Sequence, residues 1–319
     1  MKNPFVTNGY VSPEYFCDRE KETAKIVSLL TNENNIALIS PRRLGKTDLL
    51  RHCFGQPEIK EHYHTFIIDI YATSSVRDFV NVFGKAVLDE LRPKGKSVWG
   101  TFLNVLASLR SEITFDMNGQ PTWGIGLGAI TNPSATLDEI FSYLNNAGKP
   151  CLIAIDEFQQ ITKYADDPNI EAALRTHIQR CSNAHFVFSG SHRHLMGAMF
   201  TSPARPFYQS VTLINLPPIS VDKYAEFCLK HFERVSKHLD TLVVTELYER
   251  FNGITSYMQK VMNILFSMTG TGEICIPSMI DTAINDLLDF SADTYDALLY
   301  QMPEKQRIVF MAIAAEGKS

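Results

Sequence analysis

The chain has 319 residues, of which 45% are hydrophobic and 20% charged, a composition that excludes an intrinsically disordered protein. Its net charge is −5, from 30 basic and 35 acidic side chains, which excludes a uniformly basic nucleic-acid-binding protein but allows a local basic patch. No apolar run is long enough to span a membrane and the first residues do not resemble a signal peptide, so we expect a cytoplasmic protein. The 6 cysteines are scattered without a CxxC pair, and we expect reduced thiols rather than metal ligands.

Short apolar segments alternate with helical patterns up to about residue 215. These segments have the length of buried strands and cover residues 35–39, 65–70, 151–155 and 185–188. Strands that are apolar throughout and separated by helices are typical of a parallel sheet covered on both faces. The sequence therefore predicts an α/β domain with a parallel sheet over residues 1–215.

One segment of this domain interrupts the alternation. An Asn118-Gly119 pair lies between two segments that favour β-structure, Ile113–Asp116 and Thr122–Ile125. Asn-Gly favours the positive φ angles of a hairpin turn. We predict an inserted β-hairpin near residues 111–127, which serves either as a partner contact or as a surface elaboration.

The pattern changes after Pro217-Pro218. Helical stretches with few strand signals cover residues 224–231, 245–251, 256–268 and 277–288. We therefore predict a separate helical subdomain over residues 216–290. Two more short helices are expected within residues 293–319.

The segment after the first predicted strand has the pattern of a phosphate-binding loop, with serine in place of the first glycine. The helix that contains Asp48 follows it directly, and the loop residues are Ser40, Pro41, Arg42, Arg43, Leu44, Gly45, Lys46 and Thr47. Backbone N–H groups of the last four would surround the β-phosphate at the positive end of that helix. Lys46 would contact the β- and γ-phosphates, and the Thr47 hydroxyl would bind Mg²⁺. Ser40 keeps a small side chain but lacks the easy access of glycine to positive φ.

A second motif ends the strand at residues 151–155, where Asp156 and Glu157 are adjacent. Carboxylates at the carboxyl end of a parallel strand lie at the edge where such sheets bind ligands. Asp156 would hold Mg²⁺ through water, and Glu157 would orient and polarise the attacking water. An apolar run before Asp-Glu is a weak signal alone, but downstream of a phosphate-binding loop it becomes a strong one.

Together, the loop at residues 40–47 and the segment Ile155–Ile161 resemble the archaeal-type ATPases of the AAA+/STAND superfamily. Residues 16–22 resemble the segment that packs beside the adenine in that family, and Phe188–Ser191 resembles the strand end that carries the sensor-one polar residue. The resemblance covers nearly the whole chain. It departs at Thr255, where relatives commonly have proline.

The resemblance implies an AAA+-like, parallel-sheet P-loop NTPase fold with a helical lid, and ATP rather than GTP as the nucleotide. It places Phe16 and Arg19 beside the base and Asp48 next to the phosphate-binding loop. Ser189 or Ser191 would sense the γ-phosphate or position water, unless the serine only caps the next helix.

Two further expectations concern partners. Arg205 lies in a loop between Pro203 and Pro206 and is a candidate arginine finger for the ATP of an adjacent subunit. The alternative is an arginine that pairs with a surface carboxylate. Residues 291–319 resemble the start of a winged-helix segment that is truncated here.

The expected function is Mg²⁺-dependent binding and hydrolysis of ATP by a conformational switch or assembly ATPase. Two alternatives stay open, a nucleotide-bound regulatory scaffold that hydrolyses slowly or not at all, and a helper ATPase of a DNA transaction. Besides ATP, the expected partners are an unidentified protein client and further copies of the chain. Nucleic-acid binding stays open as a possibility but has no support in the truncated chain, and no membrane contact is expected.

Overall fold

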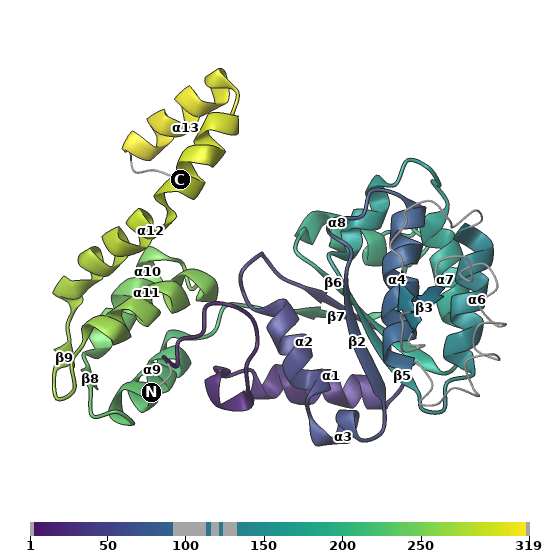
Figure 1. Ribbon diagram of the computed structural model, residues 1–319, viewed down its shortest axis with the longest axis horizontal. Coiled ribbons are helices and arrows are strands. Elements are labelled where there is room, and N and C mark those ends of the chain that lie inside the picture. The colour runs from purple at the N-terminus through teal and green to yellow at the C-terminus, as the bar shows by residue number, and fades with distance from the viewer. Residues whose placement is uncertain (1–2, 92–112, 116–120, 124–132, 317–319) are drawn as a thin grey trace. The chain divides into compact units, whose positions relative to one another are not determined.

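The computed structural model describes residues 3–91, 113–115, 121–123 and 133–316, which divide into two compact units (Figure 1). One unit comprises Arg19–Pro218 and contains the main sheet. The other comprises Met1–Asp18 together with Ile219–Ser319 and is mainly helical. The strand and helix pattern of the sequence did not predict that the N-terminal segment groups with the helical unit.

The first unit is built on a five-stranded sheet in which every neighbouring pair is parallel, which confirms the predicted α/β class. The strand order is β2-β5-β6-β1-β7. The strands are β1 (Ile36–Ile39), β2 (His64–Asp69), β5 (Cys151–Asp156), β6 (Ala184–Gly190) and β7 (Thr212–Asn215). Strands β1, β5 and β6 are buried along their whole length, as their mainly apolar sequences predict.

The parallel register brings several strand ends to one edge of the sheet. Ile39 at the end of β1 is level with Gly190 at the end of β6, and Asp69 of β2 is level with Asp156 of β5. Segments that follow these strands must therefore start close together. The phosphate-binding pattern and the Asp-Glu pair are two of these segments.

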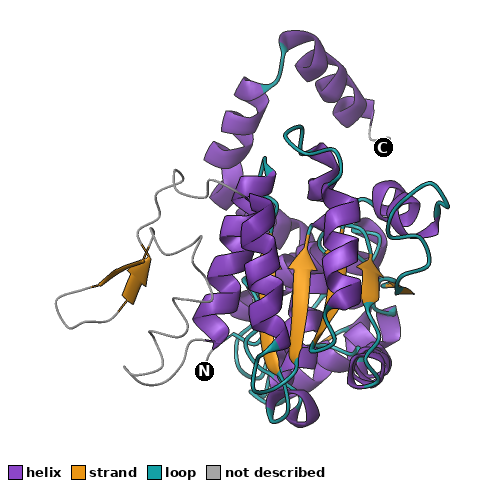
Figure 2. Ribbon diagram, turned by 90° about the vertical axis from the view of Figure 1, so that its right-hand side faces the viewer, coloured by secondary structure: helices purple, strands orange, loops and turns teal. Residues whose placement is uncertain are grey.

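Helices cover both faces of this sheet, with α1 and α2 on one side and α4, α6 and α7 on the other (Figures 1 and 2). The helices of the unit are α1 (Glu20–Thr31), α2 (Lys46–Phe54), α3 (Pro57–Lys60), α4 (Val76–Leu91), α6 (Pro133–Asn145), α7 (Ile170–Arg180) and α8 (Arg193–Thr201), with a 3₁₀ helix, η3 (Phe158–Lys163). A core of buried apolar side chains joins α4, α6, α7 and α8 to the sheet. Burial of this apolar surface holds the strand ends in place.

The predicted hairpin falls partly within the described residues. β3 (Ile113–Phe115) and β4 (Pro121–Trp123) pair antiparallel, with Thr114 opposite Thr122. They form a two-stranded sheet of their own. The Asn118-Gly119 turn and the remainder of residues 111–127 lie outside the described residues.

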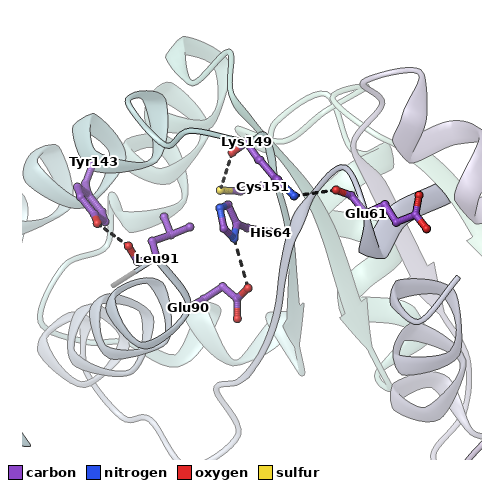
Figure 3. A network of polar contacts seen from close by, with 7 residues as sticks. All are labelled: Glu61, His64, Glu90, Leu91, Tyr143, Lys149 and Cys151. Atoms are coloured by element: carbon purple, nitrogen blue, oxygen red, sulfur yellow. Dashed lines mark hydrogen bonds and ion pairs between the residues drawn. The ribbon is translucent and has the colours of Figure 1, made fainter. Parts of the chain in front are cut away.

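Polar contacts brace the amino-terminal ends of β2 and β5, away from the strand ends discussed above (Figure 3). His64 Nδ1 lies 3.4 Å from Glu90 Oε1, which ties β2 to α4. Lys149 donates from Nζ to the backbone oxygen of Glu61 at 2.7 Å. Burial raises the pKa of the Cys151 thiol to about 12, so the thiol stays protonated at neutral pH. All 6 cysteines of the chain are buried and free.

The second unit has helices at α9 (Val221–Glu233), α10 (Thr241–Arg250), α11 (Thr255–Met268), α12 (Ile280–Gln301) and α13 (Glu304–Glu316). Short strands β8 (His238–Leu239) and β9 (Ile274–Cys275) pair parallel beside them. Two helices begin at side-chain caps, where Ser220 accepts from Lys223 N and Asp240 accepts from Leu242 N. The helical subdomain predicted from residue 216 is therefore present as packed helices.

Phe5 explains why the N-terminal segment belongs to this unit. Its side chain is fully buried, and its ring lies 5.6–6.0 Å from the rings of Phe227, Phe232 and Phe266. Asn3 adds a hydrogen bond of 2.7 Å to the backbone oxygen of Asn263. Burying one aromatic side chain contributes roughly 1.5–3 kcal/mol.

The C-terminal helices differ from the others in exposure. No residue of α13 is buried, and Phe290 and Tyr300 of α12 are 84% and 86% exposed. None of the helices in the described ranges is both long and apolar enough to cross a membrane.

His231 makes the stability of the helical unit depend on pH. The ring is 3% exposed and stacks on Tyr15 at 5.8 Å, and its Nε2 has no hydrogen-bond partner within the described part of the chain. Burial lowers the pKa of His231, the charges of Arg234 and Lys230 lower it further, and contacts with Glu14 oppose them. The unfolded chain therefore binds a proton more readily, so this contribution to stability is complete above about pH 6.5 and is lost as the pH falls.

We expect His231→Phe to reduce the loss of thermal stability between pH 7 and pH 5. Phenylalanine keeps the ring among its aromatic neighbours and removes the titrating group. The measurement is the unfolding midpoint of both proteins across this pH range, and equal acid-induced shifts would contradict the prediction. The other histidines are common to both proteins, so their contributions cancel in the comparison.

Candidate active site

The loop between β1 and α2 has the backbone of an anion-binding turn. Arg43 and Gly45 adopt left-handed conformations, with φ of 68° and 82°, and Gly45 is the N-cap residue of α2. A Cβ on Gly45 would meet no atom within 4 Å, so conformation rather than space favours glycine here. Ser40 is not in the left-handed region, so serine at the first glycine position imposes no backbone strain.

Lys46 is the first residue of α2 and folds back over its own loop. Its Nζ donates to the backbone oxygens of Ser40 at 3.1 Å and Pro41 at 3.2 Å, and the residue is 6% exposed. Burial lowers the pKa of Lys46, while the negative charges of Asp156 and Glu157 oppose that shift. A buried ammonium group held by neutral carbonyl groups is well placed to bind an anion.

Thr47 and Asp156, the two predicted metal ligands, are in direct contact. Thr47 Oγ1 donates to Asp156 Oδ2 at 2.5 Å across 109 residues of sequence. Asp156 Oδ1 accepts from the backbone N–H of Glu157 at 3.0 Å, which fixes the carboxylate at the end of β5. A hydroxyl and a carboxylate side by side fit Mg²⁺, which takes one or two protein oxygens and completes its shell with phosphate and water. Within the described ranges no three His, Cys, Asp or Glu side chains form a metal-binding group.

Glu157 lies beside this pair in an unusual backbone conformation. Its φ is 55°, and the next residue, Phe158, is fully buried with its ring 4.4 Å from that of Phe188. A left-handed conformation is unfavourable for a non-glycine residue, so neighbouring contacts must stabilise it. The packing of Phe158 against Phe188 supplies such a contact. Glu157 is thus carried on a rigid segment between β5 and η3.

The carboxylate of Glu157 has two hydrogen-bond donors. Its Oε2 accepts from Ser191 Oγ at 2.7 Å and from Gln159 Nε2 at 2.5 Å. Burial acts to raise the pKa of Glu157, but these hydrogen bonds and the charges of Lys46 and Arg42 outweigh burial and lower it. The group is therefore ionised at neutral pH, which is the state that can accept a proton from water.

Arg42 connects the loop to two neighbouring segments. Its guanidinium lies 5.3 Å from the centre of the Tyr71 ring, and its Nε donates to Ser191 Oγ at 3.4 Å. Tyr71 follows β2 and was not among the residues predicted from the sequence. A cation over an aromatic ring contributes about 0.5–1 kcal/mol at an exposed position.

The two serines considered for γ-phosphate sensing have different surroundings. Ser189, within β6, is fully buried, and its Oγ has no hydrogen-bond partner among the described residues. Ser191, just after β6, contacts Glu157. The structure therefore places Ser191 next to the predicted base, while a role for Ser189 stays a prediction.

Arg205 pairs within its own chain. Its guanidinium donates to the carboxylate of Glu171 on α7, which is 8% exposed. Burial raises the pKa of Glu171, and the charge of Arg205 opposes the rise. This contact corresponds to the alternative prediction, in which Arg205 pairs with a carboxylate of its own chain. An arginine-finger role stays a prediction, and it would require Arg205 to leave Glu171.

The other predicted binding residues lie in several places. Leu44 is buried within the loop, and Asp48 Oδ1 lies 3.8 Å from Arg51 on the exposed side of α2. Arg19 is buried and donates to Glu22 at 2.8 Å and to the backbone oxygen of Pro217 at 2.7 Å. Phe16 belongs to the helical unit, where its ring lies 5.6 Å from that of Tyr10. The positions of Phe16 and Arg19 beside a nucleotide base stay predictions.

This combination of sheet order, loop, buried lysine and Asp-Glu pair defines a P-loop NTPase. The chain belongs to the family of ATPase domains found predominantly in Archaea, whose sequence model matches residues 16–261. This match confirms the family that the loop and the Asp-Glu segment resemble. None of the curated proteins matches the chain significantly.

Solved structures share the fold at low sequence identity. A Walker-type ATPase of Pyrococcus abyssi is 19% identical, with a TM-score of 0.62 over 93% of this chain and 79% of its own. The Aeropyrum pernix ORC2 protein, in ADPNP and ADP complexes, is 14% identical, with a TM-score of 0.59 over 89% and 71%. The Aeropyrum pernix ORC1 protein, in complex with DNA, is 14% identical, with a TM-score of 0.56 over 95% and 73%.

We expect Lys46→Ala to weaken ATP binding by roughly 10- to 100-fold, the effect of losing one charge-assisted hydrogen bond to phosphate. Calorimetric titration of ATP in the presence of Mg²⁺ measures the change. Lys60→Ala is a matched control, because Lys60 is exposed on α3, outside the loop. Equal affinities of Lys46→Ala and the parent would refute the phosphate-binding assignment.

Proposed function

We propose that the protein binds ATP with Mg²⁺ and hydrolyses it. The proposal rests chiefly on the hydrogen bond between Thr47 and Asp156, with Lys46 and Glu157 as the adjoining residues. It joins a hydroxyl from the phosphate-binding loop to a carboxylate at the end of β5. Together these groups supply a cation, two hard oxygen ligands and a base at one edge of the sheet.

Each group has a distinct task in this reaction. Lys46 exchanges the backbone oxygens of Ser40 and Pro41 for phosphate oxygens, and N–H groups at the start of α2 bind the same phosphates. Thr47 and Asp156 would hold Mg²⁺, and the ion would supply positive charge that offsets the charge of the phosphates. Glu157 orients a water molecule and accepts its proton.

We further propose that the chain acts as a conformational switch or assembly ATPase, in which hydrolysis changes the position of the helical unit. The division into two compact units supports such a movement. ATP-dependent switches of this kind change shape because the nucleotide contacts differ before and after hydrolysis.

A second candidate is a regulatory scaffold that keeps its nucleotide and hydrolyses slowly. The ion pair between Arg205 and Glu171 favours it, because Arg205 in that pair does not serve as a finger. Turnover of the purified protein separates the two candidates, since both bind ATP. A helper role in a DNA transaction is the other alternative left open by the sequence, and the ORC1 neighbour was solved in complex with DNA. This role predicts salt-dependent DNA binding.

We expect Glu157→Gln to stop hydrolysis while ATP stays bound with about the parent affinity. Glutamine keeps the shape of the side chain but cannot accept the proton, so the rate should fall at least 100-fold, in the range for loss of a general base. Single-turnover hydrolysis and ATP binding are measured on the same preparations. Glu58→Gln on the exposed face of α3 is the control, and Asp156→Asn should instead alter the dependence on Mg²⁺ concentration.

Hydrolysis by Glu157→Gln at the parent rate would show that another residue activates the water. A parent protein that binds ATP without turnover would favour the scaffold.

A further inference from the structure

Gln159 is a buried residue whose side chain is only half satisfied. It lies in η3, two residues after Glu157, and is 3% exposed. Its Nε2 donates to Glu157 Oε2, whereas its Oε1 is buried without a hydrogen-bond partner within the described part of the chain. The amide nitrogen must face an ionised carboxylate, because the amide oxygen would be repelled, so this orientation is the one that chemistry requires.

Gly190 shows that the position of this amide is fixed by packing. A Cβ added to Gly190 would lie 2.4 Å from Gln159 Oε1 and 2.5 Å from Met196 Sδ. The amide and the thioether therefore occupy the space that any larger residue at the end of β6 would need. The side chain of Gln159 is wedged between the end of β6 and the carboxylate of Glu157.

The two oxygens of Glu157 have different surroundings as a result. Oε2 accepts from both Gln159 and Ser191. Oε1 accepts no hydrogen bond from the described residues. Two donors on one oxygen fix the rotation of the carboxylate and leave the second oxygen to accept a proton.

We propose that Gln159 is a positioning residue for Glu157, holding Oε2 so that Oε1 faces the attacking water. The inference rests on the hydrolysis proposed above and adds a residue to it. Gln159 acts through Glu157 and does not touch the nucleotide. A misplacement of the base by a fraction of an ångström is enough to slow proton transfer, since reacting groups must be held near their productive geometry.

The adjacent glutamine provides a matched control. Gln160 also lies in η3, and its Nε2 donates to the backbone oxygen of Thr73 at 2.8 Å instead of to Glu157. Gln159→Met and Gln160→Met each remove one side-chain amide and keep a side chain of similar length. Only the first removes a donor from the carboxylate.

We expect Gln159→Met to lower kcat for ATP about 10- to 100-fold, with KM and the ATP dissociation constant within about twofold of the parent. Gln160→Met should keep kcat within about twofold. The thermal stability of Gln159→Met should equal or exceed that of the parent, because the variant also removes a buried oxygen that has no partner. A merely structural role would instead lower stability and leave the kcat of the folded protein unchanged.

A double-mutant cycle tests whether Gln159 acts on hydrolysis through Glu157. In the Glu157→Gln background, Gln159→Met should cause no further loss of residual hydrolysis, because its action requires the carboxylate. Gly190→Ala, which displaces the same amide, should lower kcat in the same direction. Gln159→Leu repeats the test with a second apolar side chain, in case the methionine variant does not fold.

Parent turnover is measured in the same assay, which separates the two proposals. A parent that hydrolyses ATP while Gln159→Met and Gln159→Leu match it would overturn this inference alone. Faster hydrolysis by these variants, or an equal loss in Gln160→Met, would also overturn it. A parent without turnover would overturn the proposed hydrolysis and this inference together.

Discussion

Strand β6 lies between β1 and β5, and parallel pairing on both of its sides brings the ends of all three strands to one edge. The loop that follows β1 and the carboxylates at the end of β5 then face each other across the end of β6. Thr47 and Asp156 meet there although 109 residues separate them. If the register slipped by one residue, alternate side chains would exchange faces and this contact would be lost. The site therefore depends on the buried apolar strands as much as on its polar residues.

Opposite charges lie close together at this edge of the sheet. Lys46 is buried near two carboxylates, Asp156 and Glu157, and burial and attraction shift its pKa in opposite directions. Its direct hydrogen bonds nevertheless go to backbone oxygens and not to those carboxylates. The carboxylates bond instead to hydroxyl, amide and backbone donors. Cation and anions are thus near each other without a closed ion pair, so an incoming phosphate need not break one.

Elements and motifs whose residues are consecutive in the chain could be predicted best from the sequence. Four of the main strands were expected within one or two residues, because each contains a run of at least three consecutive apolar residues. β7 was not expected, since only Ile214 among its residues is buried and the run is not uniformly apolar. The loop and the Asp-Glu pair were found because their residues are adjacent and their spacing has a chemical reason.

Residues whose role depends on a distant contact could not be assigned in this way. Gln159 and Gln160 are neighbours of the same type, and only the fold shows that one reaches Glu157 and the other Thr73. The sequence offered both Ser189 and Ser191 at the end of β6, and only the fold shows that Ser191 contacts Glu157. The place of Phe5 in the helical unit likewise depends on aromatic partners more than 200 residues away.

Several unfavourable features gather at the edge of the sheet where the site lies. Arg43 and Glu157 are non-glycine residues with φ of 68° and 55°, and such conformations cost about 1–3 kcal/mol each. Gln159 Oε1 and Ser189 Oγ are buried without partners among the described residues. Stability alone would favour glycine at the strained positions and apolar side chains at the buried ones. Function accounts for these residues better than stability does. The same positions hold backbone N–H groups near the phosphates, a base near the attacking water and the side chain that supports the base. Departures from the usual rules of stability are expected at such functional positions.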